Sequence, residues 1–291
     1  MTAAQVMLDS MNQEGIHPAA EIIDDGIFHR IDDANGKPGN KLIGYICFDT
    51  AGYFCHWSIL PEGMKIHVKG NAPLSDEERR DYAVKIQLAK VARAKADQER
   101  RQECRERSAD IWAISTDGDG HPYLIAKGIE AHGARIFKGR LVIRVFNLKD
   151  ELVGLQYITK TFKWFEDGTP VKGNFGYILG DKNLPLFICE GFATGSTIHE
   201  ATGSTVFVSF SCGNLLPVAE SIRAVEGTDR TIVICADNDR FTAGNPGLTH
   251  ATAAAAAVGG LLAVPQFPGD EGTDFNDLMQ IVGDVLGGEK C

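Results

Sequence analysis

The last third of the chain alternates strand-length apolar runs with segments of helical character. The apolar runs cover 186–189, 206–210, 231–236 and 261–265, and the helical segments between them cover 193–200, 215–225 and 249–258. Strands that are apolar along their whole length, separated by helices and short loops, are typical of a parallel sheet covered on both faces. We therefore predict an α/β domain over 183–291, with a mostly parallel four-stranded sheet and flanking helices.

Acidic residues follow three of these predicted strands. Glu190 follows the first, Asp237 and Asp239 follow the third, and Asp274 and Asp277 come after the fourth. Ligands of open α/β sheets bind beyond the carboxyl ends of the strands, so we expect these side chains to gather at one edge. Gathered carboxylates repel one another unless a cation neutralises them. Oxygen ligands without Cys or His favour Mg²⁺ or Mn²⁺, which predicts a metal site for phosphoryl-transfer chemistry.

The acidic residues after the strands indicate a metal site only when they are taken together. A single acidic residue after a strand is usually a turn or a helix cap, and an isolated D-x-D is equally weak. Glu190-Gly191 after one strand and D-x-D after another, 47 residues further on, is much more specific. Gly191 would let the chain turn sharply into the next helix, whose N-terminal Thr194 to Ser196 could face an anion.

The chain before residue 183 divides into three predicted parts. Residues 1–73 read as a small β-rich region of short apolar alternations and turn dipeptides. Residues 74–110 read as a long charged helix capped by Ser75, with ten Lys or Arg against five Asp or Glu between 79 and 107. This helix is either a solvated linker or a basic arm that touches a nucleic-acid backbone. Residues 111–182 form a basic α+β segment.

The basic α+β segment interleaves cations with aromatic residues, as in Lys163-Trp164 and Lys172 to Phe175. A single-strand nucleic-acid surface needs this combination, because cations track phosphates and rings stack on bases. An amphipathic sheet with a Lys-rich outer face has the same composition, so both readings stay open.

The net charge of −10 is unevenly distributed. From residue 183 onward there are 4 Lys and Arg against 13 Asp and Glu, so nearly all the negative excess lies in the part with the predicted cation site. No apolar run reaches membrane-spanning length and the N-terminus lacks a signal-peptide core, so we expect a cytoplasmic protein with no membrane partner. Seven cysteines without a CxxC indicate free thiols. A zinc site from Cys47, Cys55, His56 and His67 fits no standard spacing.

Three motifs resemble the Toprim domain, a Rossmann-like metal-binding fold of primases, topoisomerases and some nucleases. They are ICEGFATG at 188–195, VICADND at 233–239 and GTDFNDL at 272–278. The upstream stretches HPYLIAKGIEAHGARI at 121–136 and GLQYITKTFKWF at 154–165, with VKGNFGYILG at 171–180, resemble the segment that precedes Toprim in phage and plasmid primases. The resemblance is thus to a DnaG-like primase core of the phage or plasmid type.

The resemblance implies roles for individual residues. Glu190, Asp237 and Asp239 match the catalytic metal ligands, and the glutamate is also expected to act as a general acid or base. Within the D-x-N-D element, Asp277 is expected to bind metal and Asn276 to bind nucleotide. The further candidates for template or nucleotide contacts are Gly191, Lys127, Lys160, Lys163 and Lys172.

The function implied is metal-dependent synthesis of short RNA primers on single-stranded DNA from ribonucleoside triphosphates, with a replicative helicase as a further partner. The 21–68 region lacks the zinc ligands usual in primases and no helicase P-loop follows, so we expect dependence on a partner. Two alternatives stay open, namely a Toprim nuclease acting through the same carboxylates and a non-catalytic module that binds nucleic acid or protein.

Overall fold

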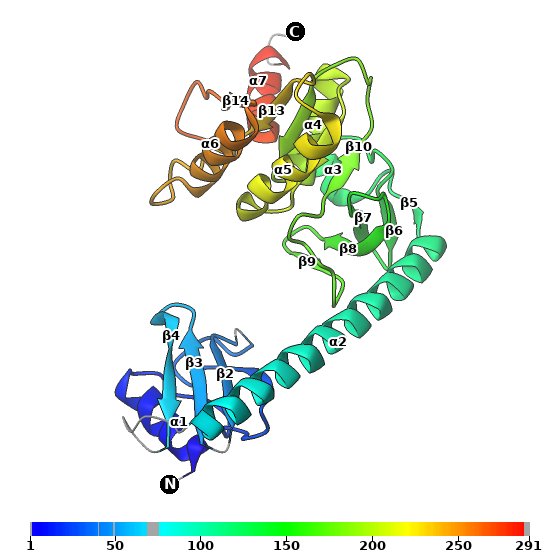
Figure 1. Ribbon diagram of the computed structural model, residues 1–291. Helices are drawn as coiled ribbons and strands as arrows, with labels where there is room; N and C mark the ends of the chain where they lie inside the picture. The colour runs from blue at the N-terminus through cyan, green and yellow to red at the C-terminus, as the bar shows by residue number, and fades with distance from the viewer. Residues whose placement is uncertain (1, 40, 49, 69–75, 288–291) are drawn as a thin grey trace. The chain divides into compact units, whose positions relative to one another are not determined.

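The computed structural model describes residues 2–39, 41–48, 50–68 and 76–287 (Figure 1). The chain forms two compact units, Met1–Glu99 and Arg100–Cys291. None of the helices in the described ranges combines the length and the hydropathy needed to cross a membrane. The predicted division into four parts is finer than these two units and stays a prediction.

The N-terminal unit is an antiparallel sheet with one helix packed on it. The sheet has the order β1-β2-β3-β4, and the helix contributes Met7 and Met11 to a core that includes Tyr45 and Phe54. The elements are α1 (Ala3–Gln13), β1 (Phe28–Ile31), β2 (Ile43–Phe48), β3 (Ala51–His56) and β4 (Leu60–His67). The predicted β-rich region is therefore an antiparallel sheet.

The structure assembles no zinc site in this sheet. Cys47 and Cys55 are buried and form no disulfide, and the buried His56 lies 3.4 Å from a carboxylate oxygen of Asp33. Within the described ranges, no three His, Cys, Asp or Glu side chains form a group that could hold a metal ion. The His56–Asp33 pair is a satisfied interior contact.

Helix α2 (Asp76–Ile114) is the long charged helix of the sequence analysis, and it continues beyond residue 110. The predicted cap Ser75 lies outside the described residues. All side chains described between 76 and 103 are exposed, while Cys104 and Ser108 are buried. Arg107 donates to Glu166 at 3.0 Å, so the last turns of α2 pack on the sheet of the C-terminal unit.

The first half of the C-terminal unit is an antiparallel sheet of order β5-β6-β7-β8-β9 with a short helix. One of its faces carries Leu141, Ile143 and Ile158, which pack with Tyr123 of α3 and with Phe192 of the following domain. The elements are β5 (Thr116–Asp117), α3 (Pro122–Lys127), β6 (Arg135–Phe137), β7 (Arg140–Phe146), β8 (Leu152–Ile158) and β9 (Lys163–Phe165). This shared core holds the basic segment against the α/β domain.

The second half is the predicted α/β domain, with strand order β10-β12-β11-β13-β14. Strand β11 runs parallel to β12 and β13, and β13 runs parallel to β14. The strands are β10 (Gly176–Ile178), β11 (Leu186–Cys189), β12 (Val206–Val208), β13 (Ile232–Cys235) and β14 (Leu261–Ala263). The helices are α4 (Phe192–Thr202), η1 (Cys212–Asn214), α5 (Leu215–Glu226), α6 (Pro246–Val258) and α7 (Phe275–Gly287).

Helices cover both faces of this sheet, as its apolar strands predict. Helices α5 and α6 pack on one face, and α4 and α7 pack on the other (Figure 1). The prediction of four strands was one short, because β10 adds an antiparallel edge strand beside β12. Its three residues come from the segment that the sequence analysis assigned to the upstream part, and a run this short has no clear period.

Gly180, two residues after β10, lies close to the backbone of Gly203 and Ser204. A Cβ atom at this position would lie 2.2 Å from the Gly203 carbonyl oxygen, whereas one at Gly213 would meet nothing within 4 Å. The Gly180 N–H also donates to the Thr205 hydroxyl at 3.0 Å. The absence of a side chain therefore allows the chain to enter the sheet here.

We expect Gly180→Ala to lower the free energy of unfolding by about 1–3 kcal/mol, because the backbone must shift to relieve the overlap. Urea denaturation followed by circular dichroism measures this change. Gly213→Ala is the matched control and should change stability by less than about 0.5 kcal/mol. Equal effects of the two substitutions would contradict the close approach.

Candidate functional site

A pocket of about 170 Å³ lies where the basic sheet meets the carboxyl ends of β11 and β13. Both halves of the C-terminal unit contribute to it, with amines and a tyrosine from one half and carboxylates from the other. Its lining residues are Tyr123, Lys127, Gln156, Lys163, Glu190, Gly191, Phe192, Ala193, Thr194, Phe210, Asp237 and Asp274. The location agrees with the rule that open α/β sheets bind ligands beyond their strand ends.

Glu190 directly follows β11, and backbone hydrogen bonds fix its position. The Glu190 carbonyl accepts from the Phe210 N–H at 2.8 Å, which extends the β11–β12 ladder by one residue. Burial raises the pKa of the Glu190 carboxyl, and the charges of Asp239 and Asp274 raise it further. Lys163 opposes this shift, but the net pKa stays above the ordinary value of a glutamate.

Asp237 is the least compensated carboxylate of the pocket. Burial and the charges of Glu190, Asp274 and Asp239 raise its pKa from 3.8 to about 8. Its Oδ1 atom is buried and has no hydrogen-bond partner. A buried oxygen without a partner carries a desolvation penalty that a ligand could remove.

Asp239 and Asp274 are oriented by hydrogen bonds. Asp239 Oδ2 accepts from the Gly247 N–H at 2.9 Å, in the first turn of α6. Asp274 accepts from the Thr194 hydroxyl at 3.2 Å and from the Asp277 N–H at 2.8 Å. Asp239 and Asp274 thus lie at the N-termini of α6 and α7, where the positive end of the helix dipole favours a carboxylate.

These oxygen donors fit a hard divalent cation. The set contains only carboxylates, and the orphaned Asp237 oxygen and the mutual repulsion both call for a positive charge. Over the part of the chain that the structure describes, no three acidic, His or Cys side chains form a group that could hold a metal ion by itself. Mg²⁺ ordinarily takes one or two carboxylates and completes its shell with waters and substrate phosphates, so an incomplete set suits it.

Lys163 lies opposite the carboxylates, at the start of β9. The residue is exposed overall, but many protein atoms surround its ammonium, which sits 5.8 Å from the Tyr123 ring centroid. Burial and the charge of Lys127 lower the pKa of Lys163, while the carboxylates oppose the shift. Two ammonium groups near each other favour an anion between or beside them.

Lys127 ends helix α3 and forms an ion pair with Asp277, with its Nζ 3.3 Å from Oδ1. Burial alone would lower the pKa of Lys127, but the charges of Asp274 and Asp277 raise it above the ordinary value. Lys127 therefore keeps its positive charge in the pocket at neutral pH.

The pocket brings together Glu190, Asp237, Lys127, Lys163 and Gly191 from the predicted set. Asp239 lies close enough to raise the pKa of Glu190 and Asp237. The remaining predicted residues, Lys160, Lys172, Asn276 and Asp277, lie outside its lining. Lys160 and Lys172 are exposed, and the Asn276 side chain is buried between helices. The roles assigned to all ten residues stay predictions.

The explanation offered for Gly191 is wrong. Gly191 has φ −104° and ψ 152°, which any residue adopts, so no sharp turn requires glycine here. An added Cβ would lie 3.5 Å from the Thr194 hydroxyl oxygen, an ordinary contact. Gly191 instead keeps this wall of the pocket free of a side chain.

Sequence reasoning missed the uncharged part of the lining, including Tyr123, Gln156 and Phe210. Gln156 had a signal, because it is a lone polar residue in the apolar strand LVGLQYI and is 5% exposed. Buried amides in strands usually serve a specific partner. No sequence signal marked Tyr123, since a tyrosine in a short amphipathic segment usually packs in the hydrophobic core.

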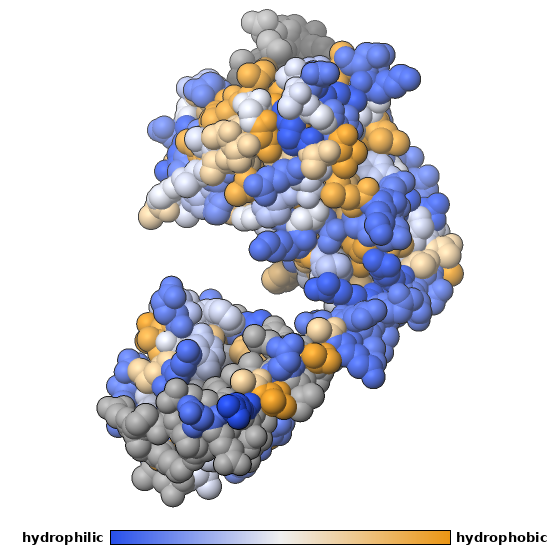
Figure 2. Space-filling model, in the orientation of Figure 1, coloured by the Kyte–Doolittle hydropathy of each residue, from blue (hydrophilic) through white to orange (hydrophobic). Residues whose placement is uncertain are grey.

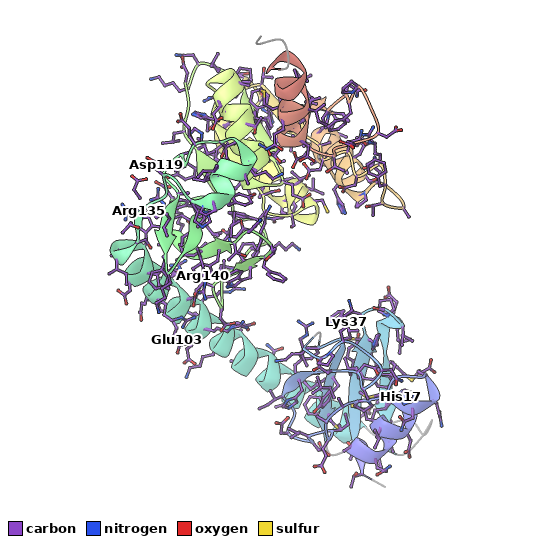
Figure 3. All side chains as sticks on the ribbon, turned by 180° about the vertical axis from the view of Figure 1, so that it is seen from behind. His17, Lys37, Glu103, Asp119, Arg135 and Arg140 are labelled. Carbon is purple, nitrogen blue, oxygen red and sulfur yellow. The ribbon has the colours of Figure 1, made fainter. Side chains whose placement is uncertain are left out.

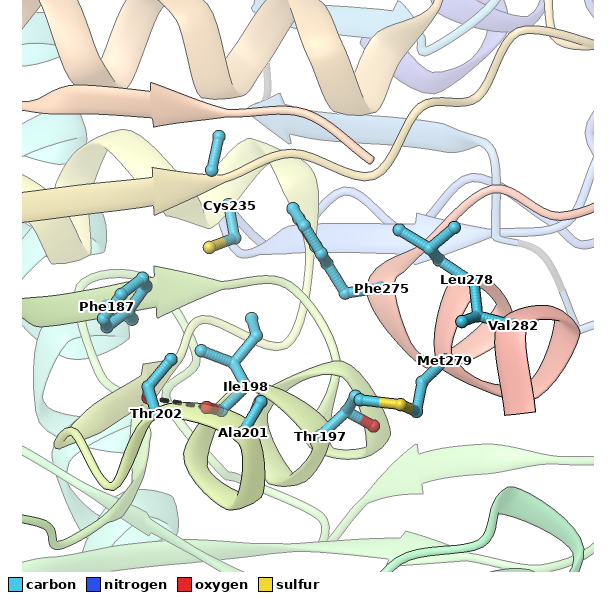
Figure 4. Close-up of a pocket in the computed structure, with 11 residues that line it drawn as sticks. Phe187, Thr197, Ile198, Ala201, Thr202, Cys235, Phe275, Leu278, Met279 and Val282 are labelled. Atoms are coloured by element: carbon cyan, nitrogen blue, oxygen red, sulfur yellow. Dashed lines mark hydrogen bonds between the residues drawn. The ribbon is translucent and has the colours of Figure 1, made fainter. Parts of the chain in front are cut away.

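A second pocket of about 310 Å³ lies between α4, α7 and the sheet (Figure 4). Its lining is almost wholly apolar, with Phe187, Ile198, Phe275, Leu278 and Val282 around it. Without charged groups it offers nothing to a metal ion or a phosphate. The polar pocket is therefore the candidate site.

The raised pKa of Asp237 predicts how the metal-free protein responds to pH. A carboxyl that binds its proton more tightly when folded contributes most stability at low pH, and the contribution is lost as the pH rises from 3.8 toward 8. Asp237→Asn mimics the protonated acid. We expect it to raise the free energy of unfolding at pH 8 by about 1 kcal/mol or more, the equivalent of one pKa unit.

Thermal unfolding with EDTA and with Mn²⁺, at pH 6 and pH 8, tests this expectation. Mn²⁺ should stabilise the wild type more at pH 8 than at pH 6, because binding displaces a proton, and should not stabilise Asp237→Asn. Asp270→Asn, at an exposed position outside the pocket, is the control. If metal-free Asp237→Asn protein were less stable than the wild type at pH 8, the charged Asp237 carboxylate would not be destabilising, and the expectation would be wrong.

Comparison with known proteins shows what this chain is similar to. Residues 185–284 match the family model of the Toprim domain. The chain is 32% identical over 299 residues to a DNA primase TraC of Escherichia coli, across 94% of this chain and 20% of the relative. A second DNA primase TraC of Escherichia coli is 33% identical over 274 residues, across 88% of this chain and 25% of the relative. The chain thus spans about a fifth to a quarter of the length of these curated relatives.

A solved structure of bacteriophage T7 lagging-strand DNA polymerase with primase domains of two gp4 subunits, bound to an RNA/DNA hybrid and dTTP, also matches. The match has 16% identity and a TM-score of 0.38, and covers 56% of this chain and 86% of that chain. Similarity at this level does not establish a shared fold. The family match and the strand order together identify the C-terminal domain of this chain as a Toprim domain.

Proposed function

We propose that this chain is a catalytic core of a DNA primase, a nucleotidyltransferase that synthesises short RNA primers on single-stranded DNA. The observation that carries the proposal is the pocket itself, in which partly buried carboxylates of the Toprim domain share the lining with Lys127 and Lys163 of the basic segment. A triphosphate with a divalent ion complements such a pocket, because the ion pairs with the carboxylates and the phosphates pair with the lysines. The similarity to DNA primases named TraC supports the same reading.

Glu190, Asp237 and Asp239 would supply one or two carboxylate ligands to Mg²⁺ or Mn²⁺, with water and substrate phosphates as the other ligands. The bound ion would stabilise negative charge on the transferring phosphate. Lys163 and Lys127 would bind phosphate oxygens of the incoming ribonucleotide and orient it. In the reaction a ribose hydroxyl attacks the α-phosphate, and pyrophosphate leaves. Glu190, whose pKa is raised by burial, would accept the proton that the hydroxyl loses.

Template binding is assigned to the basic and aromatic side chains of the sheet from β5 to β9. The Arg135 and Arg144 guanidinium groups lie 4.6 Å and 4.5 Å from the Trp112 ring centroid, and Arg140 lies 5.2 Å from that of Trp164. Figure 3 shows Arg135 and Arg140 on this sheet. Cations beside ring faces suit a single strand, since phosphates and bases alternate along it. The exposed Lys160 and Lys172 would add positive charge for further contacts with template phosphates.

The cytoplasmic location, the ribonucleoside triphosphate substrates and a replicative helicase partner follow from the primase assignment. A Toprim nuclease would use the same carboxylates with water as the attacking group. A binding module would use the basic surface alone.

Primer synthesis is the direct test. The protein is incubated with mixed-sequence single-stranded DNA, labelled ribonucleotides and Mg²⁺ or Mn²⁺, and the products are resolved by length. We expect short RNA from the wild type and at least about a 100-fold loss in Asp237→Asn with Asp239→Asn, because several kcal/mol of transition-state stabilisation depend on the ion. Asp270→Asn should behave as the wild type.

The other outcomes separate the alternatives. A shortened template without RNA, again dependent on the carboxylates, would identify a nuclease. Binding of DNA that is indifferent to the carboxylate substitutions, without turnover, would identify a binding module. Either result would overturn the primase assignment.

Tyr123 supplies a second test of the site. Its side chain is 7% exposed and its hydroxyl is buried without a hydrogen-bond partner. Tyr123→Phe removes this donor, so we expect a KM for ribonucleotides about fivefold higher, the equivalent of one hydrogen bond of about 1 kcal/mol. Stability should stay the same or rise, because the lost group had no partner.

Steady-state primer synthesis and thermal unfolding measure the two quantities. Tyr177→Phe is the matched control, since its hydroxyl donates to Asp150 at 2.8 Å, away from the pocket. An unchanged KM together with lower stability in Tyr123→Phe would show that the hydroxyl serves packing.

A further inference from the structure

The D-x-N-D element, residues 274–277, does more than end the predicted list of metal ligands. It opens helix α7. Asp274 lines the pocket, whereas Asn276 and Asp277 contact Lys127 at the end of α3. We propose that Asn276 and Gln280 are positioning residues that hold the last carbonyls of α3 and thereby fix Lys127 opposite the carboxylates. The part of this inference that concerns nucleotide binding rests on the proposed function.

Each of the last four carbonyls of α3 accepts a hydrogen bond. The Gly128 and Ile129 N–H groups close back on Ile125 and Leu124 at 3.2 Å and 3.1 Å. The two carbonyls that follow, of Ala126 and Lys127, have no partner within the helix. Gln280 Nε2 donates to the first at 3.0 Å and Asn276 Nδ2 donates to the second at 2.8 Å.

Asn276 connects three helices. Besides the Lys127 carbonyl, its Nδ2 donates to the Thr197 hydroxyl of α4 at 2.9 Å, and the residue is 1% exposed. Asn276 and Gln280 are four residues apart, so they lie on one face of α7 and meet successive carbonyls of α3. Helix α4 begins directly after Glu190 and Gly191, so the same amide relates the position of Lys127 to the first carboxylate.

Asp277 holds the other end of Lys127. Its Oδ1 pairs with the ammonium at 3.3 Å and its Oδ2 accepts from the Thr273 N–H at 3.1 Å. Both the backbone and the side chain of Lys127 are therefore held by α7, while Asp274 of the same element lines the pocket. One short sequence thus places a carboxylate and its opposing cation at once.

Two measurements test the inference. The first is the rate at which acetic anhydride labels Lys127, read by mass spectrometry with the exposed Lys172 as internal reference. We expect Gln280→Met and Asn276→Leu to label Lys127 at least about threefold faster than the wild type, in line with coupling between residues in contact. Lys172 labelling should not change. Gln280 is only partly buried, so its variant remains informative if Asn276→Leu folds poorly.

The second measurement is the affinity for ATP with Mg²⁺, by calorimetry, and the KM and kcat of primer synthesis. Gln280→Met should raise the ATP dissociation constant and the KM about three- to tenfold and leave kcat nearly unchanged. In a Lys127→Met background the same substitution should have no further effect. Gln266→Met, an exposed glutamine whose amide donates to Val264 at 3.4 Å, is the control.

Unchanged Lys127 labelling in both variants would overturn the positioning role. Effects of Gln280→Met and Lys127→Met that simply add would also overturn it, since a residue acting through Lys127 cannot matter once Lys127 is gone. If the wild type neither binds ATP nor makes primers, the proposed function fails, whereas the labelling experiment still decides the positioning of Lys127.

Discussion

Mutual repulsion among partly buried carboxylates is the interaction around which the C-terminal unit is arranged. Glu190, Asp237, Asp239 and Asp274 come from three loops at the carboxyl ends of strands. Asp239 and Asp274 raise the pKa of Glu190, and all three of these carboxylates raise the pKa of Asp237. Such a cluster destabilises the folded chain when no cation is present. Strands β11 and β13, whose ends carry three of these carboxylates, are short, parallel and largely buried, which fixes the carboxylates where a solvated loop would let them separate.

The opposing charge comes from a different sheet. Lys127 and Lys163 belong to the antiparallel half of the unit, and their distance from the carboxylates depends on how the two halves pack. Leu141, Ile143 and Ile158 of one half share a core with Phe192 and Ala193, which lie directly after Glu190 and Gly191. The hydrophobic contact between the halves therefore has an electrostatic consequence, since it sets the balance of charge in the pocket.

Much of this arrangement could be predicted from the sequence. The apolar runs at 186–189 and 231–236 give β11 and β13, and the acidic residues after them fall at one edge because parallel strands share a direction. What could not be predicted depends on long-range packing. Three-residue strands such as β10 form only because a neighbour offers a ladder, and Tyr123 joins the pocket only through the fold.

The same limit applies to Asn276 and Asp277. The resemblance to the Toprim domain implied that Asp277 binds metal and that Asn276 binds nucleotide. The structure shows the amide hydrogen bonded to a backbone carbonyl of another helix and the carboxylate paired with a lysine. A sequence pattern records which residues a site needs, but not whether a residue contacts the ligand or holds one that does. In this unit the distinction depends on the six-residue helix α3, whose last two carbonyls accept hydrogen bonds from side chains of α7.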